Sequence, residues 1–217
     1  MPIKLDRNDK WLFIGDSITD CGRAQPVGEG LFGALGSGYV QMVAGLLAAT
    51  YPEGNHRVVN MGNSGNTVRD LKGRWQRDVF DQKPDWLSVM IGTNDVWRQF
   101  DSPTQPEIHV PIDEYEATYE ELIDLTKGSV QGLILATPFY IEPNRNDPMR
   151  REMDRYGEVV KRLAAKHSAI FVDTQAAFDE TMKSIYPATI AWDRVHPNYI
   201  GVAVLAKAFL DAIQFDW

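Results

Sequence analysis

The sequence contains a single cysteine, Cys21, among its 217 residues. One thiol cannot form an internal disulfide, and scarce cysteine is typical of proteins in a reducing compartment. Positive charge is also limited, because 22 Lys and Arg residues stand against 30 Asp and Glu residues, giving a net charge of -8. Binding to nucleic acid needs concentrated positive charge, so this balance argues against a nucleic-acid-binding protein.

Long apolar runs are missing as well, and those present are far too short to span a bilayer. Residues 1–15 include Asp6, Asp9 and Lys10, where a signal peptide needs an apolar stretch. We therefore expect a cytoplasmic protein that does not bind membranes. The 44% hydrophobic and 24% charged residues are typical of globular proteins, and residues 1–217 are predicted to form one domain.

Short apolar runs alternate along the chain with longer segments of helical periodicity. The runs have the length and branched content of buried strands, and they lie at residues 11–15, 57–61, 86–92, 133–137 and 169–174. Helices are expected at residues 38–51, 67–80, 112–127, 149–167, 175–186 and 198–213. This alternation predicts an α/β fold, a three-layer, flavodoxin-like sandwich with a five-stranded parallel sheet. Residues 100–111, which contain prolines, are expected to form an inserted loop.

Polar clusters directly follow four of the predicted strands, at residues 15–17, 60–67, 92–95 and 137–140. Because ligands bind at the carboxyl ends of the strands in such sheets, these clusters are expected to lie on one rim. A fifth cluster, residues 192–198, precedes the last predicted helix, and Pro197 is expected at the first position of that helix.

These clusters contain the groups that a serine hydrolase needs. Ser17 is the candidate nucleophile, and a serine hydroxyl needs a base to accept its proton. His196 is the candidate base, and Asp193, three residues earlier, can orient the imidazole and stabilise its protonated form. The backbone N–H groups of Ser17 and Gly65 and the side-chain amide of Asn94 can together form an oxyanion hole.

Four short blocks, GDSIT, NSGNT, GTND and DRVHP, resemble the ordered motifs of the SGNH (GDSL) hydrolase family. Each block is weak alone, but four in this order are specific. The resemblance implies functional roles for Ser17, Gly65, Asn94 and His196, with Asp193 as the acid of the triad.

Longer stretches, including GNTVRDL, TPFYIEP and AWDRVHP, are similar to bacterial intracellular acetylxylan esterases within that family. The similarity extends throughout the chain. It implies removal of acetyl groups from acetylated xylo-oligosaccharides without a metal or organic cofactor, and it suggests a homo-oligomer.

Each candidate also has an ordinary structural explanation. Ser17 alone would most often be a helix N-cap, and Ser64, a rival nucleophile, is expected to be a turn residue. Cys21 is more often a small buried hydrophobic residue than a thiol nucleophile. Asp16 and Asp20 suggest a metal, but no third ligand cluster accompanies them, and Asp16 is expected to hold the nucleophile turn by hydrogen bonds.

Three aromatic residues near the predicted rim, Trp97, Tyr186 and Trp192, are candidate substrate-binding residues. Aromatic side chains bury a large area, so core packing is the alternative for each of them. Three further histidines are expected to be solvated: His56, His109 and His167.

The motifs therefore predict a serine carboxylesterase that acts through an acetyl-enzyme intermediate. One alternative is an SGNH lipase or thioesterase, which would need a longer apolar channel for its acyl chain. The other, from a different class, is a catalytically silent carbohydrate-binding protein on the same fold.

Overall fold

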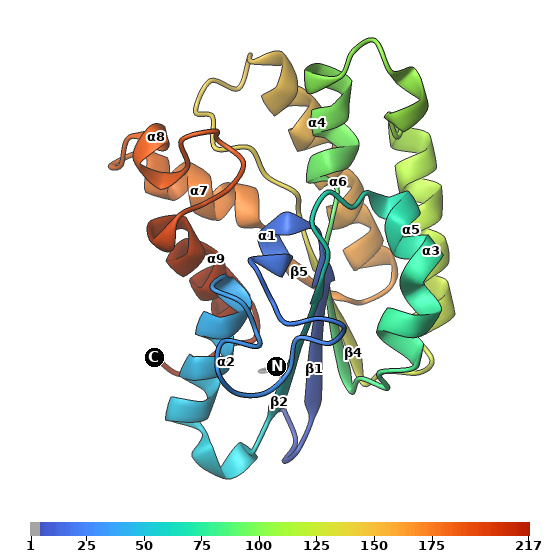
Figure 1. Cartoon of the computed structure of the whole chain (residues 1–217). Coiled ribbons are helices and arrows are strands. Elements are labelled where there is room, and N and C mark those ends of the chain that lie inside the picture. The colour runs from blue at the N-terminus through green and yellow to red at the C-terminus, as the bar shows by residue number, and fades with distance from the viewer. Residues whose placement is uncertain (1–4) are drawn as a thin grey trace.

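The computed structural model describes residues 5–217, and its centre is a five-stranded, all-parallel sheet. The strands are β1 (Lys10–Gly15), β2 (Arg57–Gly62), β3 (Trp86–Met90), β4 (Gly132–Ala136) and β5 (Ile170–Val172). Their order across the sheet is β2-β1-β3-β4-β5, the flavodoxin-like order. Helices cover both faces, so the predicted three-layer α/β fold is confirmed (Figure 1).

The helices of the described residues are α1 (Ser17–Asp20), α2 (Tyr39–Thr50), α3 (Val68–Trp75), α4 (Thr93–Asp101), α5 (Ile112–Thr126), α6 (Pro148–Lys166), α7 (Thr174–Met182), α8 (Pro187–Ile190) and α9 (Tyr199–Ala212). Short 3₁₀ turns lie at Pro52–Gly54 and Pro106–Ile108, and a π-helical turn at Gln76–Phe80 continues α3.

Strand β1 shows why the central runs are almost continuously apolar. Leu12 and Ile14 belong to the core that also contains the buried side chains of α3, α5 and α6. Trp11 and Phe13, which alternate with them, belong to the core formed with α2, α7 and α9. Because successive side chains of a strand point to opposite faces, a sheet with two covered faces favours apolar residues at almost every position.

The carboxyl ends of the strands are aligned in register. Gly15 at the end of β1 pairs with Gly62 of β2 and with Met90 of β3. Met90 in turn pairs with Ala136 of β4, which pairs with Val172 of β5. The loops that follow these strands therefore begin at one level, the upper rim of the sheet in Figure 1.

Several boundaries differ from the sequence prediction. Helix α4 was not predicted, because residues 92–95 were interpreted only as a polar cluster after a strand, and helix α8 was likewise missed. Pro197 is not the first residue of the last helix, because Asn198 is the N-cap of α9 and its side chain accepts from the N–H of Ile200. The predicted helix 67–80 is interrupted where α3 changes to the π-helical turn.

The buried guanidinium of Arg74 in α3 connects three parts of this rim. It donates to the carbonyl oxygens of Gly15 at 2.9 Å and Met61 at 2.7 Å, and to Asn66 Oδ1 at 2.6 Å. It also forms an ion pair with Asp78, whose side chain is 1% exposed. Removing Arg74 would take a charged partner from the buried Asp78 and one donor from each of the two carbonyl groups, which costs more than the loss of a surface contact.

We predict that Arg74→Met lowers the free energy of unfolding by about 3–5 kcal/mol, the range for breaking a buried ion pair. Urea denaturation followed by circular dichroism measures this change. The matched control is Arg77→Met, because Arg77 pairs with the same Asp78 from a side chain that is 72% exposed. An exposed pair contributes about 0–1 kcal/mol, so equal losses in the two variants would contradict the assignment.

Candidate active site

Ser17 lies just beyond the carboxyl end of β1 and is the first residue of helix α1. The N-cap of α1 is Asp16, whose carboxylate accepts from the N–H of Ile18 at 3.0 Å. The N-cap interpretation of Ser17 is therefore wrong, and the expected turn-holding role of Asp16 is confirmed. With its backbone fixed in this way, Ser17 Oγ lies 2.9 Å from His196 Nε2.

His196 and Asp193 lie in the loop between α8 and α9. The Nδ1 atom of His196 is 2.7 Å from one carboxylate oxygen of Asp193. The other carboxylate oxygen accepts from the backbone N–H groups of Val195 and His196, at 3.0 and 2.8 Å. The structure thus brings the three predicted residues into one hydrogen-bonded chain, the geometry that serine hydrolases use.

The surroundings of Asp193 favour its ionised form. Partial burial raises the pKa of this carboxyl, but three hydrogen bonds, from the His196 side chain and from two backbone N–H groups, outweigh burial and hold the pKa below its usual value. A carboxylate that stays charged can hold the imidazole in one tautomer and stabilise its protonated form.

Of the predicted oxyanion donors other than Ser17, Gly65 lies in the loop after β2 and Asn94 lies in helix α4 after β3. Gly65 adopts φ +82°, a conformation that L side chains rarely adopt, and no side chain or backbone atom would meet a Cβ there. Asn94 lies in the first turn of α4, and its Nδ2 donates to the carbonyl oxygen of Asn66 at 3.0 Å. This bond uses one of the two amide hydrogens, so a second donor remains beside the Gly65 loop.

The neighbouring polar residues have structural roles. Asp20 accepts hydrogen bonds from the Ser64 backbone N–H at 3.1 Å and from its hydroxyl at 2.7 Å, so Ser64 holds a turn, as expected. Within residues 5–217, no group of three or more metal-ligating side chains occurs.

Cys21 is partly buried, and burial, with a smaller contribution from Asp20, raises the pKa of its thiol to about 11. A protonated thiol is a poor nucleophile.

The candidate aromatic residues differ in position. The Trp97 ring packs edge-on against the His196 ring, with centroids 5.7 Å apart. Trp192 is 84% exposed and Tyr186 is 75% exposed, so core packing does not explain either side chain. A contact of these two with substrate stays a prediction.

The expectation of a solvated His167 is wrong, because its side chain is 5% exposed and bonds to Glu120.

Other residues near the site were not found from the sequence. The side-chain amide of Asn60, fully buried in β2, donates to the carbonyl oxygens of Thr19, at 2.7 Å, and of Leu35, at 2.9 Å. It therefore fixes the end of α1, just beyond Ser17. A buried Asn or Arg looks in the sequence like any surface residue, so no local signal marks it.

Asp95, next to Asn94, is fully buried at the start of α4. One of its oxygens accepts from the N–H of Val68 at 3.0 Å, and the other has no hydrogen-bond partner among the described residues. Burial raises the pKa of Asp95 to about 7 and that of Asp16 to about 6. Two acids with perturbed pKa values therefore flank the site, an arrangement common at functional sites.

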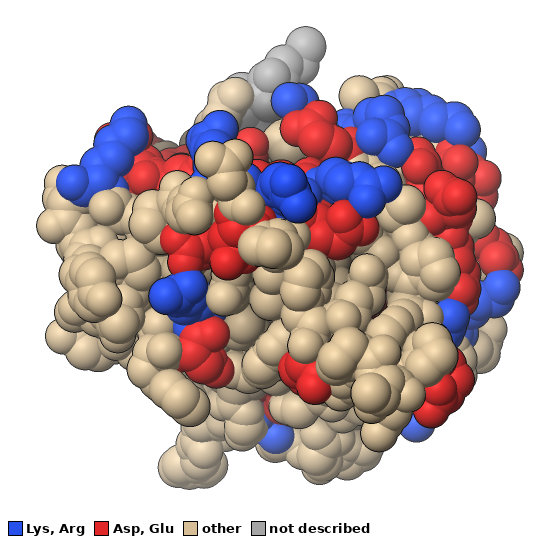
Figure 2. All heavy atoms as spheres, turned by 90° about the horizontal axis from the view of Figure 1, so that it is seen from above, with Lys and Arg blue, Asp and Glu red and all other residues tan. Residues whose placement is uncertain are grey.

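The rim seen from above carries charges of both signs. Lys and Arg side chains are intermixed with Asp and Glu, mostly along the upper and right parts of the view, and uncharged atoms cover much of the remainder (Figure 2). In the part of the chain that the structure describes, no helix is long and apolar enough to cross a membrane.

The fold and the hydrogen-bonded Ser-His-Asp chain are those of a hydrolase that uses an activated serine. Residues 13–204 match the GDSL-like lipase/acylhydrolase family, and the chain belongs to that family.

Two comparisons with known proteins extend over almost the whole chain. The acetylxylan esterase of Geobacillus stearothermophilus is 63% identical over 215 residues, which are 99% of this chain and 98% of that protein. The crystal structure of this enzyme, Axe2, matches with a TM-score of 0.98 over the same shares of the two chains. An α/β hydrolase from the metagenome of Lake Arreo in Spain is 53% identical and matches with a TM-score of 0.95, covering 96% of each chain.

Structures are also known for catalytic mutants of Axe2 in which a serine, an aspartate or a histidine is replaced by alanine. In that enzyme the serine and the histidine are separated by 179 positions, as are Ser17 and His196 in this chain. The aspartate precedes the histidine by 3 positions in both proteins.

The buried carboxyl of Asp95 predicts a pH-dependent stability. Its folded-state pKa of about 7 lies above the ordinary value of 3.8, so folding favours the neutral acid. The stability that this gives is fully present below about pH 4 and is lost as the pH rises through about 7. Asp95→Asn removes the ionisation, and the variant should lose less stability between about pH 5 and pH 8 than the unmodified protein.

Urea unfolding at the two pH values measures this difference. Asp113→Asn is the control, because Asp113 is exposed in the first turn of α5 and its replacement should leave the pH dependence unchanged. An Asp95→Asn variant with the pH dependence of the unmodified protein would show that Asp95 does not titrate in this range.

Proposed function

We propose that this protein is a serine esterase that removes acetyl groups from acetylated xylo-oligosaccharides. The observation that carries the proposal is the hydrogen-bonded chain Ser17–His196–Asp193 in a protein 63% identical to an acetylxylan esterase. The conserved spacing to the three residues of the catalytic mutants supports the assignment of these roles.

The geometry supports a two-step mechanism. Ser17 Oγ attacks the acetyl carbonyl carbon while His196 Nε2 accepts the hydroxyl proton, and Asp193 stabilises the resulting imidazolium. The backbone N–H groups of Ser17 and Gly65 and the Asn94 amide stabilise the negative charge on the carbonyl oxygen.

The bond from the acetyl carbon to the sugar oxygen then breaks, and His196 returns its proton to that oxygen. The acetyl group is left on Ser17 as an ester. In the second step His196 takes a proton from water, and the water oxygen attacks the acetyl carbon. The proton then returns to Ser17 as acetic acid leaves, and the acid ionises to acetate in solvent. Each step uses these side chains, the two backbone N–H groups and water.

The finer assignments are part of the same proposal. Trp97 is proposed to narrow the acyl site, because its ring contacts His196. Trp192 and Tyr186 are proposed to contact the sugar, because both expose large aromatic surfaces and Trp192 directly precedes Asp193. The proposed partners are the oligosaccharide and further copies of this chain, but neither nucleic acid nor membrane. The scarcity of cysteine supports a cytoplasmic location.

We predict that Ser17→Ala lowers acetate release from acetylated xylo-oligosaccharides by at least about 10³-fold, because the acetyl-enzyme cannot form. His196→Ala should be similarly inactive, and the double variant should be little worse, since the residues of a triad act as a unit. Full activity in a folded Ser17→Ala protein would exclude the mechanism and would favour another nucleophile.

Nitrophenyl esters of increasing acyl length, measured in the same experiment, separate the acetyl esterase from the lipase-type alternative. An acetyl-sized site loses activity as the acyl chain grows. An apolar channel instead favours longer chains by about 0.8 kcal/mol for each buried methylene. Faster hydrolysis of an octanoate than of an acetate ester would reverse the assignment. Binding of oligosaccharide without any acetate release would indicate the silent carbohydrate-binding protein.

Asn94 is predicted to act mainly on the transition state, because its amide stabilises charge that develops only there. Asn94→Ala should therefore lower kcat by about 10²–10³-fold with little change in KM. Asn94→Asp should be at least as harmful, because it places an anion where the oxyanion forms. If Asn94 only supports the fold, both variants would instead show a lower melting temperature and a near-normal kcat.

A further inference from the structure

Arg194 lies between Asp193 and His196, and both its backbone and its side chain are bound by the segment that follows β4. Its carbonyl oxygen accepts from the Ile141 N–H at 2.9 Å, and its guanidinium forms an ion pair with Glu142. These contacts join the loop of the candidate base to residues more than fifty positions earlier in the chain.

Glu142 is itself held in place. Its side chain is 10% exposed, and the carboxylate oxygen that does not face Arg194 accepts from the Asn144 N–H at 2.8 Å. Its backbone carbonyl accepts from Arg150 at 2.6 Å, and the Arg150 side chain is 2% exposed. The carboxylate therefore presents a fixed partner to Arg194.

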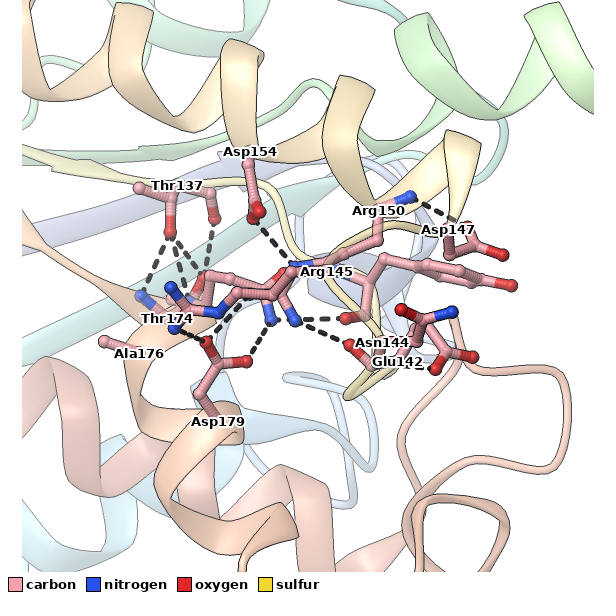
Figure 3. A network of polar contacts seen from close by, with 12 residues as sticks. Thr137, Glu142, Asn144, Arg145, Asp147, Arg150, Asp154, Thr174, Ala176 and Asp179 are labelled. Carbon is pink, nitrogen blue, oxygen red and sulfur yellow. Dashed lines mark hydrogen bonds and ion pairs between the residues drawn. The ribbon is translucent and has the colours of Figure 1, made fainter.

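Arg150 anchors this chain of contacts to two helices. Its guanidinium donates to Asp154 in α6 and to Asp179 in α7, each at 2.8 Å (Figure 3). The same group reaches the Glu142 carbonyl, as Figure 3 shows. A continuous series of hydrogen bonds and ion pairs thus extends from α6 and α7 to the loop that carries the candidate base.

The backbone of the loop needs such support. Arg194 has φ +65°, in the left-handed region that disfavours residues with a Cβ atom. A conformation of this kind persists only where the surrounding contacts determine it. The next residue, Val195, is 1% exposed and lies in the core. It does not fix the backbone of Arg194, which depends on the contacts of Arg194 itself.

We propose that Glu142 and Arg194 are positioning residues for the hydrolysis. Their ion pair, supported by Arg150, fixes the backbone between Asp193 and His196 and so holds the base toward the nucleophile. This inference rests on the proposed function, in which the Asp193–His196 pair acts as the base.

The test compares Arg194→Gly, Glu142→Ala and the double variant. Glycine adopts a positive φ without penalty, so Arg194→Gly removes the side chain while it tolerates the native backbone. Each single variant should lower kcat for a nitrophenyl acetate about ten- to a hundredfold, since a small misplacement of a catalytic group has effects of this size. KM should change by less than about twofold, and the double variant should be no worse than the poorer single variant.

Two further variants separate positioning from charge and from stability. Glu142→Gln keeps a side-chain oxygen that accepts from Arg194, so it should restore most of the kcat lost in Glu142→Ala. The matched controls are Glu116→Ala and Arg162→Ala. These two side chains form an ion pair of 2.8 Å that joins α5 and α6, and the pair lies away from the site. These control variants should keep the kcat of the unmodified protein.

Proton NMR gives a readout that loss of stability alone does not move. The proton between His196 Nδ1 and Asp193 should give a low-field signal in the unmodified protein and in Glu142→Gln. It should broaden or vanish in folded Arg194→Gly and Glu142→Ala. If Arg194→Gly does not fold, Glu142→Ala carries the test, because that substitution leaves the loop sequence intact.

The outcomes distinguish this inference from the proposed function. Unchanged kcat and an unchanged low-field signal in Glu142→Ala, together with an inactive Ser17→Ala, would overturn the positioning role alone. Strictly additive losses in the double variant would also overturn it. Full activity of Ser17→Ala would instead overturn the proposed function.

Discussion

The buried guanidinium of Arg74 is the interaction on which the arrangement of the rim depends. It binds the last carbonyl of β1, a carbonyl near the end of β2 and the side chain of Asn66. The nucleophile loop begins directly after the first of these contacts, and Gly65 directly precedes Asn66. One cation thus fixes the relative position of Ser17 and Gly65, the proposed oxyanion donor. Its cost of burial is offset by Asp78 and by three further acceptors.

The parallel sheet determines where such polar groups can lie. Both faces of the strands are covered by helices, so the strand interiors are apolar and polar groups collect at the aligned carboxyl ends. The buried side chains at these strand ends, such as Asp16 and Asp95, are shielded from water, which strengthens their electrostatic interactions. The raised pKa values of Asp16 and Asp95 have the same cause, because both acids are buried where the loops begin.

Much of the fold and the grouping of the central residues of the candidate site were predictable from the sequence. The five strands are almost continuously apolar runs, and Ser17, Asp193 and His196 occur in short motifs whose order is informative. Helix α4 was missed because its first residues, Thr93–Asp95, resemble a turn and its apolar face is short. The supporting charges were missed for another reason: burial of an Arg such as Arg150 depends on partners that the fold brings together from distant positions.

The nucleophile and the base of the candidate triad are held in place by different kinds of contact. Ser17 follows a central strand, and the capping carboxylate of Asp16 and the core fix its backbone. His196 lies in a loop 179 positions later, where a side chain that is 43% exposed cannot be fixed by packing alone. Directional bonds supply the missing constraint, from Asp193 within the loop and from Ile141 on the neighbouring segment. The proposed base can therefore stay open to solvent and still hold one orientation, because hydrogen bonds fix direction without covering the ring.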